Sequence, residues 1–380
     1  MPSPLRVPRP LMFVLFWAVL MFNGLFVWIV LQPGPATSAA PTNHEPSRPL
    51  EGEASRFEFR QTHMGSEFTL ILYSADEAKA RRGSDAAFAR IAQLDAAFSD
   101  YQPESELMRL CDQAGGPPVK VSSDLLSILN RSKSMAQRSG GAFDPTVGPV
   151  VRLWRRARRT RELPGADLLA KARDFVGIDK MTLDDQAGTV QLARKGMKLD
   201  LGGIAKGFAS DEALATLRRQ GIRQALVAGA GDIAAGDPPP GAKGWTVGIA
   251  PLEAPGARPS RFLALSHACV STSGDAERFV VIDGVRYSHI VDPGTGLGLT
   301  RRASVTVVTN DGATSDSLAT AATVLGPEQG LKLVESVPNA AALFVIKEGG
   351  KTKAIESSRW KTLPTASPKS EKAAAVVPTD

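Results

Sequence analysis

Residues 11–31 form an apolar segment that fixes how the rest of the chain can be arranged. Its 21 residues, LMFVLFWAVLMFNGLFVWIVL, contain Asn23 as the only hydrogen-bonding side chain other than tryptophan. A helix needs about 20 apolar residues to span a bilayer, whereas the apolar part of a cleaved signal peptide has about 7–15. Arg6 and Arg9 precede the segment and favour a cytoplasmic N-terminus. The sequence therefore predicts a cytoplasmic stretch at 1–10 and a transmembrane signal anchor at 11–31.

The expected location of the protein follows from this anchor. We expect a single-pass protein of the cell inner (cytoplasmic) membrane whose folded part lies on the periplasmic, extracytoplasmic side. Residues 36–40, ATSAA, are small, so cleavage after the apolar segment stays an alternative.

Composition indicates a folded body behind the anchor. Of the 380 residues, 43% are hydrophobic and 22% are charged, which is typical of a globular protein. Residues 32–55 are rich in Pro, Ser, Ala and Thr and indicate a linker, and 359–380 have the same character and indicate a disordered tail. A single folded domain is therefore expected over 56–358.

The chain has only two cysteines, Cys111 and Cys269. Two are too few for a disulfide framework or a four-cysteine zinc site. They either pair with each other in an oxidising compartment or are small buried hydrophobic side chains, and we favour burial.

Apolar spacing along the body mixes strands and helices without strict alternation. Strand patterns occur at 56–74, 188–193, 197–201, 224–231, 244–252, 278–284, 301–309 and 342–348. Helical patterns occur at 75–100, 124–141, 207–220, 315–326 and 327–336. This organisation predicts an α+β fold with mixed sheets and packed helices rather than a doubly wound parallel sheet.

The stretch 197–207, MKLDLGGIAKG, is the most informative for chemistry. A strand ending at Leu201 would lead through two glycines into a helix, so that backbone N–H groups point at an anion. Lys206 adds a positive charge, and Asp200 adds a carboxylate that can hydrogen-bond a ligand. The spacing matches neither the P-loop nor the Rossmann pattern, and a purely structural turn is the alternative.

His289 lies in the stretch 281–298 and is one of four histidines in the chain. Asp292 and a Pro-Gly-Thr-Gly turn follow it, a loop composition that predicts exposed residues. His289 is a candidate general base or phosphate-contacting group, and a merely solvated histidine is the alternative.

Asp316 and Thr320 stand four residues apart near the start of a predicted helix. This spacing places both oxygens on one helical face. A carboxylate and a hydroxyl, completed by waters and phosphate oxygens, suit Mg²⁺. Capping of the helix N-terminus by Asp and Ser is the alternative.

Two further features lie next to each other at 139–161. Glycines and prolines bracket Phe143 and Asp144, in a loop that either offers backbone groups and an aromatic ring to a planar ligand or is a plain turn.

Six of the ten residues from Arg152 to Arg161 are arginines. Such a run is usually a solvated helix face, with anionic lipid or an acidic partner protein as the alternative. Nucleic acid is not expected outside the membrane.

Taken in order, these stretches resemble the ApbE family, the FAD:protein FMN transferases, over roughly 56–358. The matching motifs are weak singly and specific as an ordered set. They are Met64-Gly65-Ser66, Ser99 with Tyr101, Ser105 and Glu106, 141–149, 200–207, 272–275, 289–293 with Thr295 and Gly296, and Asp316 with Ala319 and Thr320.

The resemblance implies an ApbE-like fold and an enzyme that transfers the FMN half of FAD to a Thr or Ser hydroxyl, forming a phosphoester and releasing AMP. The implied metal is Mg²⁺. The implied partner is a target flavoprotein subunit of an exported or membrane redox complex. The chain would then be a single extracytoplasmic catalytic domain behind its membrane helix.

The resemblance also implies roles for individual residues. His289 is the implied catalytic residue, and the implied Mg²⁺ ligands are the Gly203 carbonyl oxygen, Asp316 and Thr320. Either Tyr101 or Phe143 would stack on a ring of FAD. The implied FAD-binding residues are Met64, Tyr101, Ala142, Phe143, Asp144, Asp200, Lys206 and Ile290.

The chain departs from the family pattern at several positions. Ala230 replaces a glycine in a turn beside the implied site, and Gly294 replaces an arginine. These departures motivate a first alternative, a non-catalytic flavin-binding or flavin-delivery factor for an exported redox enzyme. A Mg²⁺-dependent FAD pyrophosphatase, in which water replaces the protein hydroxyl, is a second.

Overall fold

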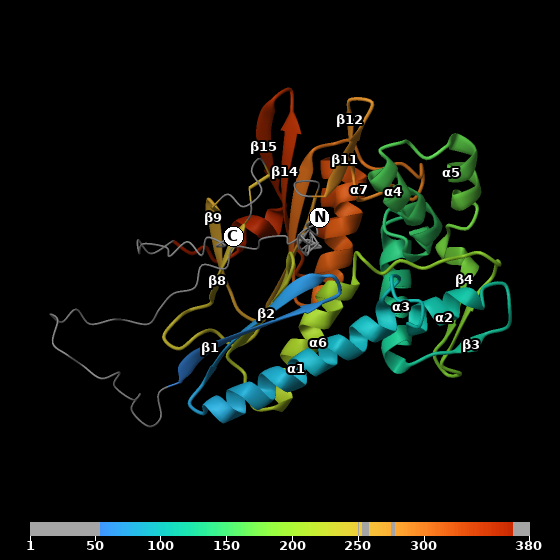
Figure 1. Ribbon diagram of the computed structural model, residues 1–380. Helices are drawn as coiled ribbons and strands as arrows, with labels where there is room; N and C mark the ends of the chain where they lie inside the picture. The colour runs from blue at the N-terminus through green and yellow to red at the C-terminus, as the bar shows by residue number, and fades with distance from the viewer. Residues whose placement is uncertain (1–53, 250, 253–257, 275–277, 368–380) are drawn as a thin grey trace, which may run out of the picture.

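The computed structural model describes residues 54–249, 251–252, 258–274 and 278–367 (Figure 1). The predicted anchor, the stretch before it and all but the end of the predicted linker lie outside the described residues. In the described part of the chain, no helix is long and apolar enough to cross a membrane.

An eight-stranded sheet in the order β1-β2-β6-β7-β10-β13-β14-β15 forms the centre of the fold. Each neighbouring pair in it is antiparallel. Its strands are β1 (Ser55–His63), β2 (Ser66–Ser74), β6 (Ala225–Gly229), β7 (Asp232–Ala235), β10 (Ala268–Gly274), β13 (Ala303–Thr309), β14 (Ala341–Glu348) and β15 (Lys351–Glu356).

The predicted strand region 56–74 is a hairpin. Met64 and Gly65 join β1 to β2 with φ of 50° and 66°, as a two-residue hairpin turn of the primed type requires. The Met64 N–H donates to Asp95 Oδ2 at 2.8 Å. Asp95 lies on α1 (Glu77–Phe98), so this bond ties the turn to the first helix.

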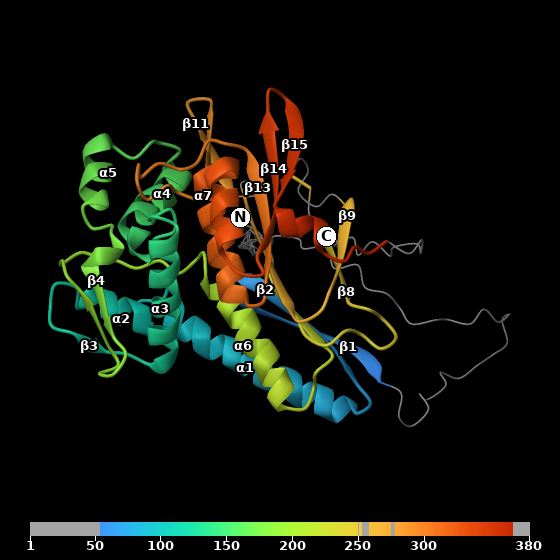
Figure 2. The ribbon, with the colours of Figure 1, turned by 180° about the vertical axis from the view of Figure 1, so that it is seen from behind.

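Helix α1, with α6 (Ala205–Arg219) and α7 (Gly312–Ser336), covers one face of the sheet. In Figures 1 and 2, α6 and α7 stand between the sheet and the remaining helices. The break predicted between the helical segments 315–326 and 327–336 is confirmed, because Gly326 within α7 has a non-helical φ of 76° and ψ of −179° just before Pro327.

The other face of the sheet is covered by the hairpin β8 (Trp245–Ile249) and β9 (Arg261–Leu265) and by the short helix η3 (Ser358–Thr362). Trp360 is buried there, and the Ala264 N–H donates to the Pro364 carbonyl at 2.8 Å. The first part of the predicted tail is therefore packed on the body, because its tryptophan and backbone find partners. Residues 368–380 lie outside the described part.

A second helical layer flanks α7. It consists of α2 (Glu106–Asp112), α3 (Ser123–Arg138), η1 (Pro145–Val147), α4 (Gly148–Thr160), α5 (Ala166–Arg173) and η2 (Ile178–Lys180), with the small sheet β3 (Val119–Lys120), β5 (Thr189–Leu192) and β4 (Met181–Asp184). The hairpin β11 (Phe279–Ile282) and β12 (Val285–Ser288) packs on α4 through the rings of Trp154 and Tyr287, whose centroids are 5.1 Å apart.

The α+β class is confirmed, but the strand predicted at 197–201 is wrong. Its backbone bonds to neighbouring loops and helices instead of to a strand. The Leu199 N–H donates to Cys111 Sγ at 3.2 Å, and the Asp200 N–H donates to the Pro145 carbonyl at 2.8 Å. An apolar run therefore marks burial here without marking a sheet.

The cysteines agree with the favoured interpretation. Cys111 and Cys269 are both buried and free. Cys269 donates to Asp211 Oδ1 at 3.0 Å, so each sulfur has a local partner and the pairing alternative does not apply.

Candidate active site

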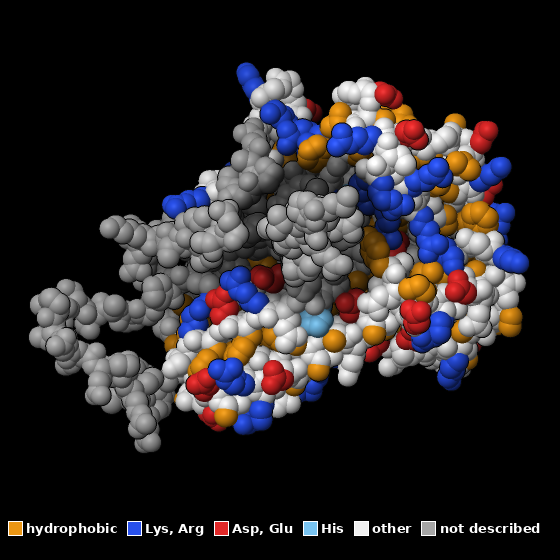
Figure 3. Space-filling view, viewed as in Figure 1, with side chains coloured by type: hydrophobic (Ala, Val, Ile, Leu, Met, Phe, Trp, Pro, Cys, Tyr) orange, Lys and Arg blue, Asp and Glu red, His pale blue; other side chains and the backbone are white. Residues whose placement is uncertain are grey.

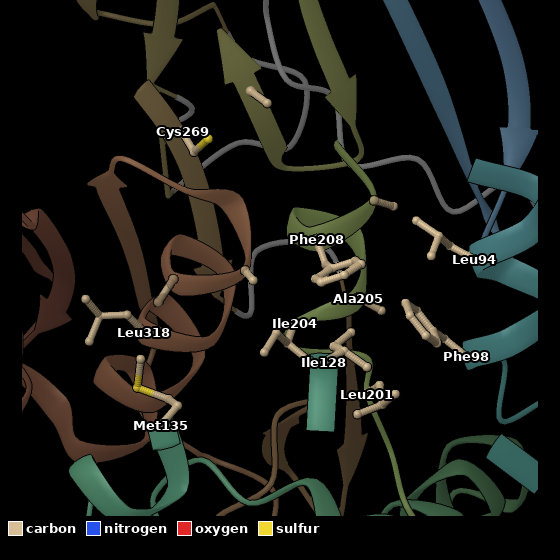
Figure 4. Close-up of a cluster of buried hydrophobic side chains, with 14 of the residues drawn as sticks. Leu94, Phe98, Ile128, Met135, Leu201, Ile204, Ala205, Phe208, Cys269 and Leu318 are labelled. Carbon is tan, nitrogen blue, oxygen red and sulfur yellow. The ribbon is translucent and has the colours of Figure 1, made fainter. Parts of the chain in front are cut away.

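The turn that leads into α6 is anchored by its apolar side chains. Leu201, Ile204 and Phe208 lie in the cluster of buried side chains shown in Figure 4, facing α1 and α3. The polar side chains of the same turn, Asp200 and Lys206, keep polar partners outside this cluster. The alternation of apolar and polar residues thus fixes the turn while leaving two charged groups for chemistry.

The N-terminus of α6 is capped from another helix. No side chain at its own N-cap, Ile204, accepts a backbone N–H. Asp316 Oδ2 on α7 instead accepts the Gly207 N–H at 3.2 Å. A Cβ at Gly207 would lie 2.0 Å from the Gly312 carbonyl oxygen, so only glycine permits this approach. The anion expected at this helix N-terminus is therefore, first of all, a carboxylate of the chain itself.

Lys206 lies between two buried carboxylates. Its Nζ is 3.1 Å from Asp232 Oδ2 and 3.8 Å from Asp316 Oδ2. Burial by itself lowers the pKa of Lys206, but the two carboxylates outweigh it and raise that pKa well above the usual range. Burial, and then the Asp232 charge, raise the pKa of Asp316 to about 7. The site therefore holds a permanently charged lysine and a carboxylate that titrates near neutrality.

The predicted Mg²⁺ ligands lie together. A Cβ at Gly203 would be 2.8 Å from Thr320 Oγ1, and Asp316 is one turn before Thr320 on α7. Asp316 does not cap its own helix, because the cap of α7 is Asp311, which accepts the Thr314 N–H. The capping alternative therefore fails for Asp316.

The oxygen atoms of Gly203, Asp316 and Thr320 suit Mg²⁺ as part of a coordination shell that other ligands complete. In the described residues, no group of three or more His, Cys, Asp and Glu side chains could hold a metal. One carboxylate, one hydroxyl and one carbonyl oxygen match Mg²⁺ when water and substrate phosphate complete the shell, which is how this ion is usually bound.

His289 follows β12 and is held by the residue that precedes β11. Its N–H donates to the Arg278 carbonyl at 3.0 Å, and its Nδ1 lies 3.1 Å from the same oxygen. Because a carbonyl only accepts, Nδ1 carries the proton and Nε2 is left with the lone pair. Burial, and then the Arg278 charge, lower the pKa of His289 to about 4. The imidazole is therefore neutral, and able to accept a proton, at neutral pH.

The exposure predicted for this loop is wrong for most of its residues. His289 is half-buried, and Ile290, Val291 and Pro293 are buried. The hairpin that carries them packs on α4, where Trp154 Nε1 donates to the Gly296 carbonyl at 2.8 Å. The charges of Arg158 and Lys206 also lower the pKa of His289.

Of the two predicted stacking rings, only Tyr101 is accessible. Its side chain is 73% exposed, whereas Phe143 is buried in the core. The Arg155 guanidinium lies over the Tyr101 ring, 4.1 Å from its centroid, and its Nη2 donates to Asp200 Oδ2 at 3.0 Å. Asp200 Oδ1 accepts the Gly202 N–H at 2.8 Å. The structure thus joins Tyr101 and Asp200 through an arginine that was not predicted as a site residue.

The side chains of Ala142, Asp144 and Ile290 are buried. Asp144 Oδ1 accepts from the Thr146 N–H and hydroxyl at 2.8 and 2.6 Å, so this carboxylate caps η1. Ala142 is buried, as is Ile290, whose N–H donates to Ser288 Oγ. Met64 lies in the β1–β2 turn described above. The loop at 142–144 reaches Asp200 through Pro145, and no hydrogen bond or ion pair in the described residues joins Met64 to Lys206.

Four residues beside the site were missed. Asp232 sits at the start of β7, after a turn in which Ala230 has φ of 57°, a conformation usual for glycine or asparagine. Ser273 Oγ lies 3.2 Å from Thr320 Oγ1, and Arg278 holds His289. A run of arginines gave no sign that Arg155 turns inward. Asp232 and Ser273 had sequence signals, because Asp232 closes a glycine-rich turn between two apolar strands and Ser273 lies in the motif 272–275.

Comparisons with known proteins agree on one family. The sequence profile of the ApbE family matches residues 64–344. An FAD:protein FMN transferase of Treponema pallidum (strain Nichols) is 36% identical over 277 residues, which cover 69% of this chain and 76% of that protein. Another from Klebsiella pneumoniae (strain 342) is 32% identical over 286 residues, 75% of this chain and 87% of that protein.

Solved structures show the same likeness. The flavin transferase ApbE from Vibrio cholerae aligns with a TM-score of 0.74 and 27% identity, over 82% of this chain and 99% of that chain. The ApbE protein from Thermotoga maritima aligns with a TM-score of 0.73 and 29% identity, over 81% and 99% of the two chains.

Proposed function

This chain belongs to the ApbE family, and we propose that it transfers the FMN half of FAD to a Ser or Thr hydroxyl of a target flavoprotein, with Mg²⁺, and releases AMP. Relatives named FAD:protein FMN transferase support the reaction. The observation that carries the assignment to this site is the cluster of Lys206, Asp232 and Asp316 beside Gly203 and Thr320.

The cluster supplies charge where a pyrophosphate would be cleaved. Gly203, Asp316 and Thr320 would hold Mg²⁺, which when bound neutralises charge on phosphate oxygens and on the leaving group. Lys206 keeps its proton because two carboxylates raise its pKa, so it contributes a fixed positive charge beside the metal ligands.

His289 is assigned to proton transfer. Its Nε2 takes the proton of the acceptor hydroxyl as the hydroxyl oxygen bonds to the FMN phosphorus and the bond from that phosphorus to the AMP oxygen breaks. Nδ1 keeps its own proton and donates it in a hydrogen bond to the Arg278 carbonyl, which keeps the ring oriented. A pKa of about 4 makes the neutral form abundant at neutral pH.

The FAD seat combines a ring, a carboxylate and backbone groups. The Tyr101 ring offers a stacking face, Asp200 accepts a hydrogen bond, and 142–144, Met64 and Ile290 line the seat with backbone and apolar atoms. Phe143 contributes its backbone only, because its ring lies in the core.

A Mg²⁺ titration of FAD binding tests this assignment. The full chain should bind FAD more tightly as Mg²⁺ is added, and Asp316→Asn should abolish that enhancement while retaining metal-free binding. A Glu328→Gln change at an exposed position of the same helix serves as the matched control. Equal Mg²⁺ enhancement in Asp316→Asn and the parent would remove Asp316 from the metal site.

The location of the protein completes the proposal. Residues 11–31 would anchor the chain in the cytoplasmic membrane, with the catalytic domain and its redox-complex target on the periplasmic side. Protease added to intact spheroplasts should then degrade the body, and deletion of 1–31 should release it from membranes. A body that is protected in spheroplasts and digested only after lysis would contradict this orientation.

A further inference from the structure

Arg155 joins three groups of the proposed FAD seat. Its Nη1 is 2.5 Å from Asp100 Oδ2, its Nη2 is 3.0 Å from Asp200 Oδ2, and its Cζ is 4.1 Å from the centre of the Tyr101 ring. The arginine side chain is 17% exposed, so it lies largely under the surface that Tyr101 presents.

Arg155 points to a different side of α4 from most of the other arginines in 152–161. Trp154 and Ala157 form the buried side of the helix, and Arg156 and Arg159 are exposed. Arg155 is half-buried at the boundary between these two sides, where it pairs with Asp200. Lys and Arg side chains gather over α4 in Figure 3. The run is thus a solvated face only in part, since the acidic partners of Arg155 belong to the chain itself.

We propose that Arg155 is a positioning residue for FAD: it backs one face of the Tyr101 ring and bridges Asp100 to Asp200, so that the open ring face and the Asp200 carboxylate are presented together. This inference rests on the proposed function, because it deepens the assignment of Tyr101 and Asp200 to the FAD seat.

The Tyr101 ring has one face that is covered by Arg155 and one that is open. With 73% of Tyr101 exposed and Arg155 against one ring face, the opposite face is open to a planar ring. A guanidinium on the back of an aromatic ring restrains that ring through a cation–π contact. A flexible surface tyrosine would instead lose side-chain freedom when FAD binds.

Arg155 also offsets the negative charges of Asp100 and Asp200. Burial and the Asp100 charge raise the pKa of Asp200, while Arg155, the Gly202 N–H and Arg158 lower it. These are the charged and donor groups that face Asp200, from the end of α1, from α4 and from its own turn. Without Arg155 the pKa of Asp200 would rise further, because Arg155 is one of the groups that lower it, and a protonated Asp200 would be a donor instead of an acceptor.

Two variants separate the two parts. Arg155→Lys keeps the charge and loses the planar stacking group, and Arg155→Met loses both. Arg156→Met, exposed on the same helix, is the control. The readouts are FAD affinity from pH 5.5 to 8.5 and the quenching of flavin fluorescence, which reports ring stacking on tyrosine.

We expect Arg155→Met to bind FAD roughly tenfold more weakly at neutral pH, with affinity that rises with pH. Arg155→Lys should keep the pH dependence of the parent but quench flavin less. Tyr101→Leu should weaken binding as well, and adding Arg155→Met to it should cost less than in the parent, because the two side chains act as one unit.

Unchanged affinity, pH dependence and quenching in the Arg155 variants would overturn the inference while FAD binding by the parent left the proposed function standing. If Arg155→Met does not fold, Arg155→Lys decides, and parent-like quenching in it would overturn the stacking role. A parent chain that binds no FAD would overturn both the inference and the proposed function.

Discussion

The carboxylate of Asp316 on α7 accepts the backbone N–H of Gly207 on α6 at 3.2 Å. One group therefore closes the N-terminus of a helix and stands among the proposed metal ligands. The backbones meet at Gly207 and Gly312, where a Cβ on either residue would lie within 2.3 Å of the other's carbonyl oxygen. Packing of two helices is thus what brings the charged groups of the site together.

Replacing His289 should stop transfer without emptying the FAD seat. His289→Asn should lower the transfer rate by about 10²–10⁴-fold, the usual contribution of a general base, and leave FAD affinity within about twofold. His267→Asn is a suitable control, because His267 is an exposed histidine whose φ of 51° asparagine tolerates. A transfer rate in His289→Asn equal to that of the control would exclude His289 as the base.

The rate of the parent enzyme should depend little on His289 protonation above pH 5. An ordinary histidine would lose its base form as the pH fell through 6.5, but the pKa of His289 is lowered to about 4. The base therefore stays neutral from pH 8 down to about pH 5 and protonates below that. Rates measured at saturating FAD and Mg²⁺ check this, and a fall centred on pH 6.5 that disappears in His289→Asn would contradict it.

Mg²⁺ affinity should depend on pH through Asp316. Because the pKa of this carboxyl is raised to about 7, it is partly protonated at neutral pH, and the cation must displace that proton. Apparent Mg²⁺ affinity should rise up to about tenfold per pH unit below pH 7 and level off above it. Isothermal titration at pH 6 and pH 8 measures the difference, and equal affinities at the two values would show that no proton is displaced.

Lys206 should contribute to stability as well as to chemistry. Lys206→Met would leave Asp232 and Asp316 buried side by side without a cation, and we expect a loss of about 3 kcal/mol in the free energy of unfolding. Adding Asp232→Asn removes one of the two charges and should restore part of that loss. Urea unfolding in the presence of EDTA gives both values. If the double variant were less stable than Lys206→Met, the lysine would not be holding the two carboxylates together.

A second ion-pair network should affect stability alone. Arg90 on α1 pairs with Asp124 on α3 at 2.6 Å and with Glu212 on α6 at 2.9 Å, and its side chain is 19% exposed. Arg90→Met should lower the free energy of unfolding by about 1–3 kcal/mol. Transfer per folded molecule should match the parent, and a lower rate at temperatures where the variant is fully folded would place this network in the function.

The parts of the fold that follow local spacing were predictable. The helical patterns at 75–100, 124–141 and 207–220 became α1, α3 and α6, because each has an apolar stripe that the core needs. The run at 197–201 has the apolar pattern of a strand without being one, because burial and strand pairing produce the same pattern. Trp360 shows the reverse case, since one buried tryptophan holds a stretch whose composition otherwise indicates a tail.

The candidate site was predictable where one short motif supplies the residue and its neighbours. Asp316 and Thr320 are one helical turn apart, and Lys206 begins the helix that meets them. Arg155 was not predictable as a site residue, because its partners are far away in sequence and only the packing of α4 brings them close. The glycine-rich turn before Asp232 was a signal, but its ion pair with Lys206 depends on the packing of β7. The burial of the Phe143 ring was not predictable either, because the sequence of its loop does not indicate which side chains face the core.

The most direct test of the account is transfer itself. The full chain is incubated with FAD, Mg²⁺ and an exported flavoprotein subunit bearing an acceptor threonine, and covalently attached FMN and released AMP are both quantified. We predict equal amounts of attached FMN and AMP, no label when the acceptor threonine is replaced by alanine, and neither product with His289→Asn. AMP released without any labelled protein would contradict it and indicate a pyrophosphatase, and tight FAD binding without AMP would indicate a binding protein.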